Sequence, residues 1–281
     1  RDHFPDGRYY KTSYSLKNCK EDLIIIGSSR GEQNYIPKIF EDSLGLGCWN
    51  ASRGGQGLPY FRAIEEGIFD RYTPKVVILN VDENDLVTPP DYEIAGVLRP
   101  YYHSCPPIRP VLNKASHFEW LLMQSRLYEY NSSFYYLLRP YLIQGLDGKP
   151  SDKGWKPNSG NLKVELTKKL EIVDEIDKDS LNKESVALIE TFVKKIRQRG
   201  SQLIFVVSPN YGRRSDSSHT IKYLKEKSRK EDIPLFIYSS DTAFITNPSY
   251  FADPDHLNVK GAQLFSKDLV HKIRLQIAPG K

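Results

Sequence analysis

Acyl transfer through a serine requires a small set of residue types, and this sequence contains a serine, an asparagine, an aspartate and a histidine that could supply them. They are Ser29, Asn84, Asp253 and His256. A serine hydroxyl becomes a nucleophile when a base removes its proton, and histidine is the natural base because its unperturbed pKa lies near neutrality. Asp253, three residues before His256, can accept a hydrogen bond from the imidazole and fix its tautomer. These residue types predict a nucleophile, a base and an orienting acid.

The negative charge that develops on an attacked carbonyl oxygen needs hydrogen-bond donors aimed at it. Gly55, in the loop of residues 52–57, offers a backbone N–H that no side chain obstructs, and Asn84 offers a side-chain amide. We therefore predict an oxyanion hole formed by Ser29, Gly55 and Asn84.

Buried strands must position these residues. Residues 23–26 are four branched aliphatic residues stopped by Gly27-Ser28-Ser29, a pattern typical of a strand covered on both faces in a parallel sheet. Residues 47–51 and 75–81 predict two further strands, which precede the Gly54-Gly55 turn and Asn84. The carboxyl ends of parallel strands lie at one edge of the sheet, where ligands of open α/β proteins bind.

Strand and helix patterns alternate along the rest of the chain. Its 281 residues, 39% of them hydrophobic, suffice for one large domain over 1–281. We expect an α/β fold with three layers, α/β/α, around a central, mostly parallel sheet. A helical insertion at about 89–161, with aromatic helices at 118–130 and 134–143, is expected to pack on the same domain. Helices are predicted at 36–44, 58–72, 181–199, 220–229 and 258–276, and strands at 202–207 and 234–238.

Four short blocks resemble the SGNH (GDSL-type) hydrolase superfamily. Gly27-Ser28-Ser29 stands where the family has Gly-Asp-Ser, and residues 50–55 resemble the second block, whose last glycine donates to the oxyanion. Glu83-Asn84-Asp85 resembles the third block, usually Gly-x-Asn-Asp. Residues 253–256 match the closing Asp-x-x-His. The sequence departs from the family at Ser28, which replaces Asp, and at Asp82, which stands where the third block has Gly.

The resemblance implies an SGNH/flavodoxin-like fold and ester hydrolysis through an acyl-serine intermediate, with Ser29 as nucleophile. His256 would act first as general base and then as general acid. No metal ion or organic cofactor is implied. Ser28 stays a second candidate for the nucleophile, and Asp255 an alternative to Asp253 as the orienting acid.

The substrate is less defined by the sequence. Side chains near the blocks that can contact a sugar ring or an acidic group are Arg30, Arg53, Tyr211 and Arg213, although a solvated charge is the competing interpretation for each arginine. Deacetylation of carbohydrate is common among relatives with a long aromatic insertion, so we predict a carbohydrate O-acetyl esterase acting on a glycan or small-molecule ester. Two alternatives stay open: an SGNH-like O-acyltransferase acting on a glycan, and a non-catalytic carbohydrate-binding relative.

Composition restricts the partners and the location. The net charge of +5 is spread along helices and interleaved with acids, which disfavours a nucleic-acid-binding protein. The three cysteines (Cys19, Cys48 and Cys105) lack metal-ligand spacing; one disulfide is compatible with them, but its pairing is open. No apolar run approaches the roughly 20 residues of a membrane span, so we expect no stable membrane insertion. The chain opens at Arg1, so we expect an exported form without its targeting segment. The oligomeric state is open.

Overall fold

The computed structural model describes residues 9–130, 152–163, 173–174 and 180–277, with the side chains of 173–174, 213–214 and 277 left undescribed.

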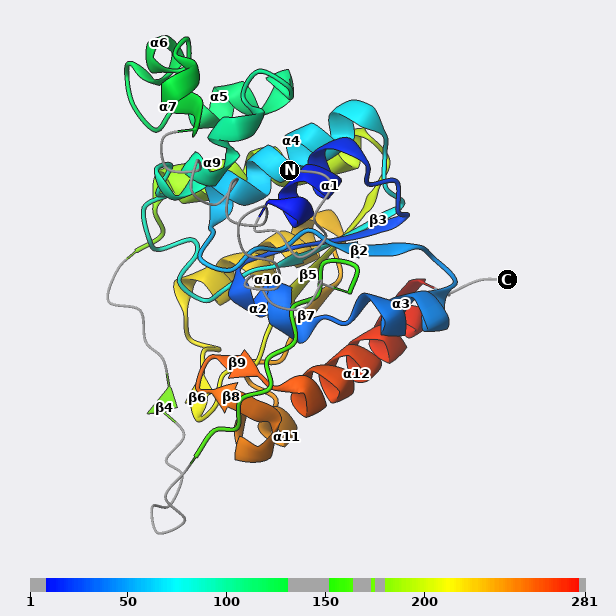
Figure 1. Ribbon diagram of the computed structural model, residues 1–281. Coiled ribbons are helices and arrows are strands. Elements are labelled where there is room, and N and C mark those ends of the chain that lie inside the picture. Colours follow the sequence, from blue (N-terminus) through cyan, green and yellow to red (C-terminus); the bar gives the residue numbers. More distant parts are fainter. Residues whose placement is uncertain (1–8, 131–151, 164–172, 175–179, 278–281) are drawn as a thin grey trace.

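Five parallel strands form the central sheet (Figure 1). In spatial order they are β2 (Cys48–Asn50), β1 (Leu23–Ile26), β3 (Val76–Asn80), β5 (Gln202–Val207) and β7 (Leu235–Ile237). The strand order reverses at β1, because β2 lies on one side of it and β3 on the other. In open α/β sheets a crevice forms outside the carboxyl ends of the strands at such a reversal.

Consecutive side chains of each strand enter two different hydrophobic cores. Ile24 and Ile26 of β1 lie in one core with Val77 and Leu79 of β3. The alternate residues Leu23 and Ile25 lie in the other core, together with Val76 and Ile78. Both faces of the sheet are therefore covered, which explains why these strands are continuous apolar runs and do not alternate with polar residues.

Helices cover each face. Figure 1 shows α1 (Tyr10–Lys17), α4 (Leu58–Arg71) and α9 (Lys183–Gln198) on one side of the sheet and α3 (Pro37–Leu44) and α12 (Val259–Ile277) on the other. Ile221 and Leu224 of α10 (His219–Glu231) pack into the first core. The predicted three-layer α/β/α fold is confirmed, and the five helices predicted outside the insertion begin and end within two residues of the observed ones.

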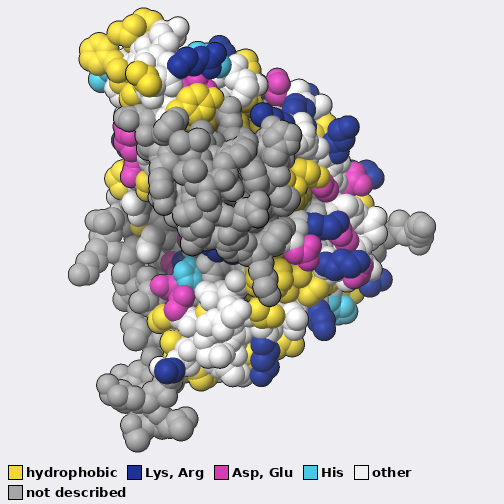
Figure 2. Space-filling view, viewed as in Figure 1, with side chains coloured by type: hydrophobic (Ala, Val, Ile, Leu, Met, Phe, Trp, Pro, Cys, Tyr) yellow, Lys and Arg dark blue, Asp and Glu magenta, His cyan; other side chains and the backbone are white. Residues whose placement is uncertain are grey.

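Short elements replace the longer helices predicted in the insertion. They are η1 (Ile94–Tyr101), η2 (Pro106–Ile108), α5 (Arg109–Leu112), α6 (Glu119–Leu122) and α7 (Arg126–Tyr130). The helical stretch predicted over 118–130 is interrupted, because α6 and α7 are separated by residues 123–125. His103 Nε2 lies 2.8 Å from the carbonyl oxygen of Met123, which a continuous helix would use within itself. The helix predicted over 134–143 lies outside the described residues. In Figure 2 hydrophobic side chains gather at the upper left, over α6 and α7.

Candidate active site

An antiparallel hairpin holds the aspartate and the histidine. Asp253 ends β8 (Phe251–Asp253) and His256 begins β9 (His256–Leu257). Asp253 Oδ1 accepts the backbone N–H groups of Asp255 and His256, each at 3.0 Å. The same carboxylate lies 2.8 and 3.0 Å from His256 Nδ1. The turn therefore fixes the acid against one nitrogen of the imidazole.

The other imidazole nitrogen meets the predicted nucleophile. Ser29 is the first residue of α2 (Ser29–Asn34), directly after β1, and its Oγ lies 2.7 Å from His256 Nε2. A carboxylate only accepts hydrogen bonds, so Nδ1 of the imidazole carries the proton that faces Asp253. In the neutral ring Nε2 then carries no proton, so it accepts a hydrogen bond from the Ser29 hydroxyl. This is the geometry of a base placed to activate a hydroxyl.

The structure separates the alternatives that the sequence left open. Ser28 Oγ donates to Asp82 Oδ2 at 2.5 Å, so Ser29 is the serine that contacts the histidine. Asp255 contributes a backbone N–H to the turn, and it is the Asp253 carboxylate that contacts the imidazole.

Glu32, one turn along α2 from the nucleophile, fixes the glycine turn. Its Oε2 accepts the N–H of Gly54 at 3.0 Å, and its Oε1 accepts Lys11 Nζ at 2.5 Å. Burial by itself raises the pKa of Glu32, but the Lys11 ammonium and these hydrogen bonds lower it overall. Burial lowers the pKa of Lys11 to about 8, although Glu32 opposes this shift.

Gly54 and Gly55 differ in what they offer to a substrate. A Cβ on Gly54 would lie 3.6 Å from Ser29 Cβ, so the Gly54 backbone lies against the nucleophile. The Gly54 N–H, however, is already bonded to Glu32. Gly55 adopts a left-handed conformation (φ 70°) that favours glycine. Among the described residues none accepts its N–H. The Gly55 N–H therefore stays free to donate, one residue after the glycine whose backbone lies against Ser29.

The turn that presents Asn84 is fixed by ion pairs beside the nucleophile. Arg30 Nε lies 3.2 Å from Asp82 Oδ1, and its Nη1 lies 2.7 Å from Glu83 Oε2. The amide of Asn210 also donates to Glu83. Burial lowers the pKa of Arg30, but the two carboxylates outweigh it and raise the pKa. The Asn84 side chain is exposed, with no hydrogen-bond partner in the described part of the chain.

Sequence reasoning missed this network and the Lys11–Glu32 pair. One feature of the sequence pointed to the network. Ser28 and Asp82 are the two departures from the family pattern, and the structure shows that they are hydrogen-bonded to each other. Lys11 gave no signal, since nothing in the sequence shows that α1 reaches the loop after β2.

The predicted substrate-binding side chains are mostly engaged in contacts within the protein. The Arg30 guanidinium is committed to Asp82 and Glu83. Arg53 Nη1 donates to Thr12 Oγ1 at 3.1 Å. Tyr211 packs its half-buried ring against Phe251, with ring centroids 5.6 Å apart, and its N–H donates to the Pro254 carbonyl. The Arg213 side chain lies outside the described part of the structure, although its backbone forms β6 (Arg213–Arg214).

Cys19, Cys48 and Cys105 are free thiols. Within the described ranges, acidic, histidine and cysteine side chains form no group of three suited to a metal ion, and no helix has the length and apolarity to cross a membrane.

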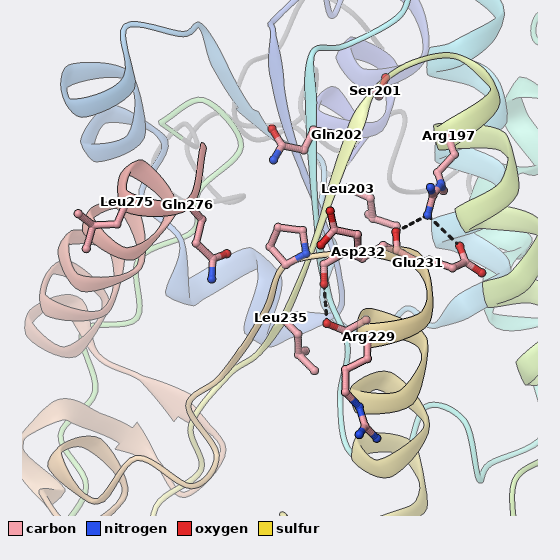
Figure 3. A pocket seen from close by; sticks show the side chains of 13 residues that line it. Arg197, Ser201, Gln202, Leu203, Arg229, Glu231, Asp232, Leu235, Leu275 and Gln276 are labelled. Carbon is pink, nitrogen blue, oxygen red and sulfur yellow. Dashed lines mark hydrogen bonds and ion pairs between the residues drawn. The ribbon is translucent and has the colours of Figure 1, made fainter. Parts of the chain in front are cut away.

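A hollow of about 800 Å³ lies at the opposite edge of the sheet from Ser29, where β5 and β7 begin (Figure 3). Gln202 and Leu235 line it, together with Leu275 near the end of α12. Its Arg197 is paired with the Glu231 backbone carbonyl and carboxylate. This hollow contributes nothing to the serine–histidine arrangement.

No family model and no curated protein matches this chain. Among solved structures it is similar to a crystal structure of a “putative acylhydrolase” from Bacteroides fragilis, with a TM-score of 0.47 and 12% sequence identity. The match covers 96% of this chain and 95% of that one. A likeness at this level assigns no activity to this chain, so the functional argument depends on the site itself.

Proposed function

We propose that this protein is a serine esterase that hydrolyses ester bonds through an acyl-serine intermediate. The observation that carries the proposal is the hydrogen-bonded series Asp253–His256–Ser29 at the carboxyl edge of a parallel sheet. Each hydrogen bond runs in the direction that proton removal from the serine needs.

In the first half-reaction, His256 removes the proton of Ser29 as Oγ attacks the carbonyl carbon of the ester. The oxyanion accepts hydrogen bonds from the N–H groups of Ser29 and Gly55 and from the Asn84 amide. His256 then gives its proton to the leaving alcohol, and the acyl group remains on Ser29.

In the second half-reaction, His256 removes a proton from water as the water oxygen attacks the acyl-serine. Collapse of this intermediate releases the carboxylic acid, and His256 returns the proton to Ser29 Oγ. Asp253 stabilises the imidazolium in both halves and is not itself protonated.

We further propose that the substrate is an O-acetyl group on a carbohydrate and that the protein acts outside the cytoplasm. The Gly54 backbone lines Ser29 closely, which suits a small acyl group. The groups around the nucleophile are polar, with an exposed Asn84 and a partly exposed Asp253, which suits a hydrophilic alcohol. An exported location would bring the enzyme to such glycans.

The test is acetate-ester hydrolysis by the wild type, Ser29→Ala and Ser28→Ala, first with p-nitrophenyl acetate and then with acetylated polysaccharides. We expect Ser29→Ala to lose roughly 10⁴-fold or more in kcat and Ser28→Ala to stay within about tenfold of the wild type. Normal rates in Ser29→Ala, or no ester cleaved by the wild type, would contradict the proposal. Acyl transfer to an added glycan that exceeds hydrolysis would favour the transferase.

A further inference from the structure

The helix that carries the nucleophile is short, and distant segments complete its carboxyl end. The last four carbonyl groups of an α-helix have no partner within the helix, and α2 has only six residues. Each of the four accepts a hydrogen bond from elsewhere in the fold: Gly31 from Asn50 Nδ2 at 2.8 Å, Glu32 from the Lys156 N–H at 3.1 Å, Gln33 from Trp155 Nε1 at 2.7 Å and Asn34 from Ser266 Oγ at 3.1 Å. Two of these donors belong to residues 153–162, which we call the strap.

The strap also contacts the hairpin that carries the aspartate and the histidine. The Leu162 N–H donates to the carbonyl of Phe251 in β8 at 2.9 Å. The Val259 N–H, just after β9, donates to the Asn158 carbonyl at 3.1 Å. In Figure 1 the green trace of the strap runs past α2 toward β8 and β9. One segment therefore contacts both halves of the candidate site.

Two side chains of the strap converge on a single residue of α2. Asn158 Nδ2 donates to Gln33 Oε1 at 2.9 Å, and the Trp155 indole N–H donates to the Gln33 carbonyl. The half-buried Trp155 ring packs on the second core, as Leu162 does. Asn158 thus holds α2 with its side chain and the hairpin region with its backbone.

The strap is anchored at its start to the edge of the sheet. The Asn50 N–H of β2 donates to the Lys153 carbonyl at 3.0 Å. Gly154 has a φ of 86°, and a Cβ there would lie 2.0 Å from the Asn50 carbonyl oxygen, so this close approach requires glycine. Lys153 Nζ also lies 2.7 Å from Glu41 Oε1 in α3. These contacts fix the strap relative to the strand that leads into the glycine turn.

We propose that the strap is a positioning element for catalysis, in which Trp155 and Asn158 hold α2 and the hairpin at the separation that brings Ser29 Oγ to His256 Nε2. This inference rests on the proposed esterase function. The two side chains act through Gln33, because their hydrogen bonds end on α2 and not on the reacting atoms.

The size of the effect follows from what remains when the strap is weakened. The Leu257 N–H donates to Asn34 Oδ1 at 3.2 Å, so α2 and the hairpin also contact each other directly. A displacement of about 1 Å between reacting groups lowers a rate by about 100-fold. Because the Asn34 contact persists, the loss expected without the strap's side-chain bonds is smaller than this.

The test compares the wild type with Trp155→Phe/Asn158→Ala, which removes both side-chain hydrogen bonds to Gln33 and keeps an aromatic ring at position 155. The matched control is Tyr72→Phe, which also keeps its ring and loses a donor to a backbone carbonyl, that of Glu21 at the amino edge of the sheet. With p-nitrophenyl acetate, we expect the strap variant to lose roughly tenfold in kcat with KM unchanged. Trp155→Phe alone should lose a few-fold, and the control should keep both constants.

Amide hydrogen exchange gives a readout that does not depend on esterase activity. The strap variant should exchange several-fold faster than the wild type in both α2 and β8–β9, and at the wild-type rate in α10, which packs on the opposite face of the sheet. Wild-type kcat in both strap variants, or faster exchange confined to residues 153–162, would overturn the proposal. If the wild type cleaved no ester, the proposed function would fail, and the exchange rates would still decide whether the strap joins α2 to the hairpin.

Discussion

A buried arginine–glutamate pair lies in each of two regions that present very different side chains. At the carboxyl edge of the sheet, Arg30 lies 2.7 Å from Glu83; in the insertion, Arg99 lies 2.6 Å from Glu119. Both glutamates are almost completely buried. The first pair fixes the turn that exposes the amide of Asn84, whereas the second fixes a helix that exposes hydrophobic side chains.

Buried ion pairs contribute little net stability, because removing two charges from water offsets their attraction. In both regions the main contribution of the ion pair is to fix the orientation of the element that carries it. A polar pair inside each element determines which neighbouring side chains face solvent, a donor amide in one case and hydrophobic side chains in the other. We therefore expect changes at the edge to alter catalysis and changes in the insertion to alter stability without altering catalysis.

The largest effects are expected within the hydrogen-bonded series. His256→Ala should reduce kcat by roughly 10⁴-fold or more, and Asp253→Asn should leave more residual activity because the imidazole keeps its contact with Ser29. Adding His256→Ala to Ser29→Ala should cause little further loss, because members of a catalytic unit are not additive. Steady-state kinetics checks both statements. Multiplicative losses in the double variant would show that the two residues do not act together.

Asn84→Ala tests the exposed amide. Loss of one oxyanion donor should lower kcat by about 10²- to 10³-fold with little change in KM, because the bond forms only in the transition state. Since Asn84 is exposed and has no described partner, stability should change by less than about 0.5 kcal/mol. Urea unfolding and kinetics on the same preparation separate the two quantities. A raised KM with unchanged kcat would instead assign Asn84 to ground-state binding.

Glu119→Gln and Glu83→Gln separate the two regions directly. Glu119→Gln should lower the free energy of unfolding by on the order of 2–4 kcal/mol, because Arg99 loses its buried partner. Hydrolysis by the remaining folded protein should be unchanged. Glu83→Gln should lower the free energy of unfolding by less, because Arg30 keeps its ion pair with Asp82, and it should lower kcat. Loss of catalysis in folded Glu119→Gln would show that the regions are coupled.

Lys11 supplies a pH-dependent test of the edge. Burial lowers its pKa in the folded protein to about 8, from the usual 10.5 of a lysine side chain. Between these values the unfolded chain binds more protons, so this residue makes the free energy of unfolding rise with pH, by about 3 kcal/mol in total. The difference in unfolding free energy between wild type and Lys11→Met should therefore increase from pH 8 to pH 10. A constant difference would mean that burial does not shift this pKa.

The sequence was informative where a feature depends on local pattern. Apolar runs such as residues 23–26 and 75–81 predicted the parallel sheet, and short blocks predicted which residues would lie at its edge. Contacts between distant segments could not be predicted, because Arg30 and Glu83, or Lys11 and Glu32, meet only through the fold. The same holds for the break in the predicted helix over 118–130, since His103 contacts the Met123 carbonyl from another segment. An aromatic insertion also predicts burial, and only the structure shows Trp120 facing outward.

The smallest effect is expected at Ser28, whose hydroxyl donates to Asp82 at 2.5 Å. Ser28→Ala removes this donor and leaves Asp82 bonded to Arg30 and Asn80, so the turn carrying Asn84 should loosen but persist. We expect a few-fold lower kcat, an unchanged KM and about 1 kcal/mol less stability. Ser201→Ala is the matched control, because that buried hydroxyl makes an equally short bond to the Pro74 carbonyl at the other edge of the sheet. Equal stability losses with a lower kcat only in Ser28→Ala would show that Ser28 positions the site, whereas unchanged kcat in both would limit Ser28 to a structural role.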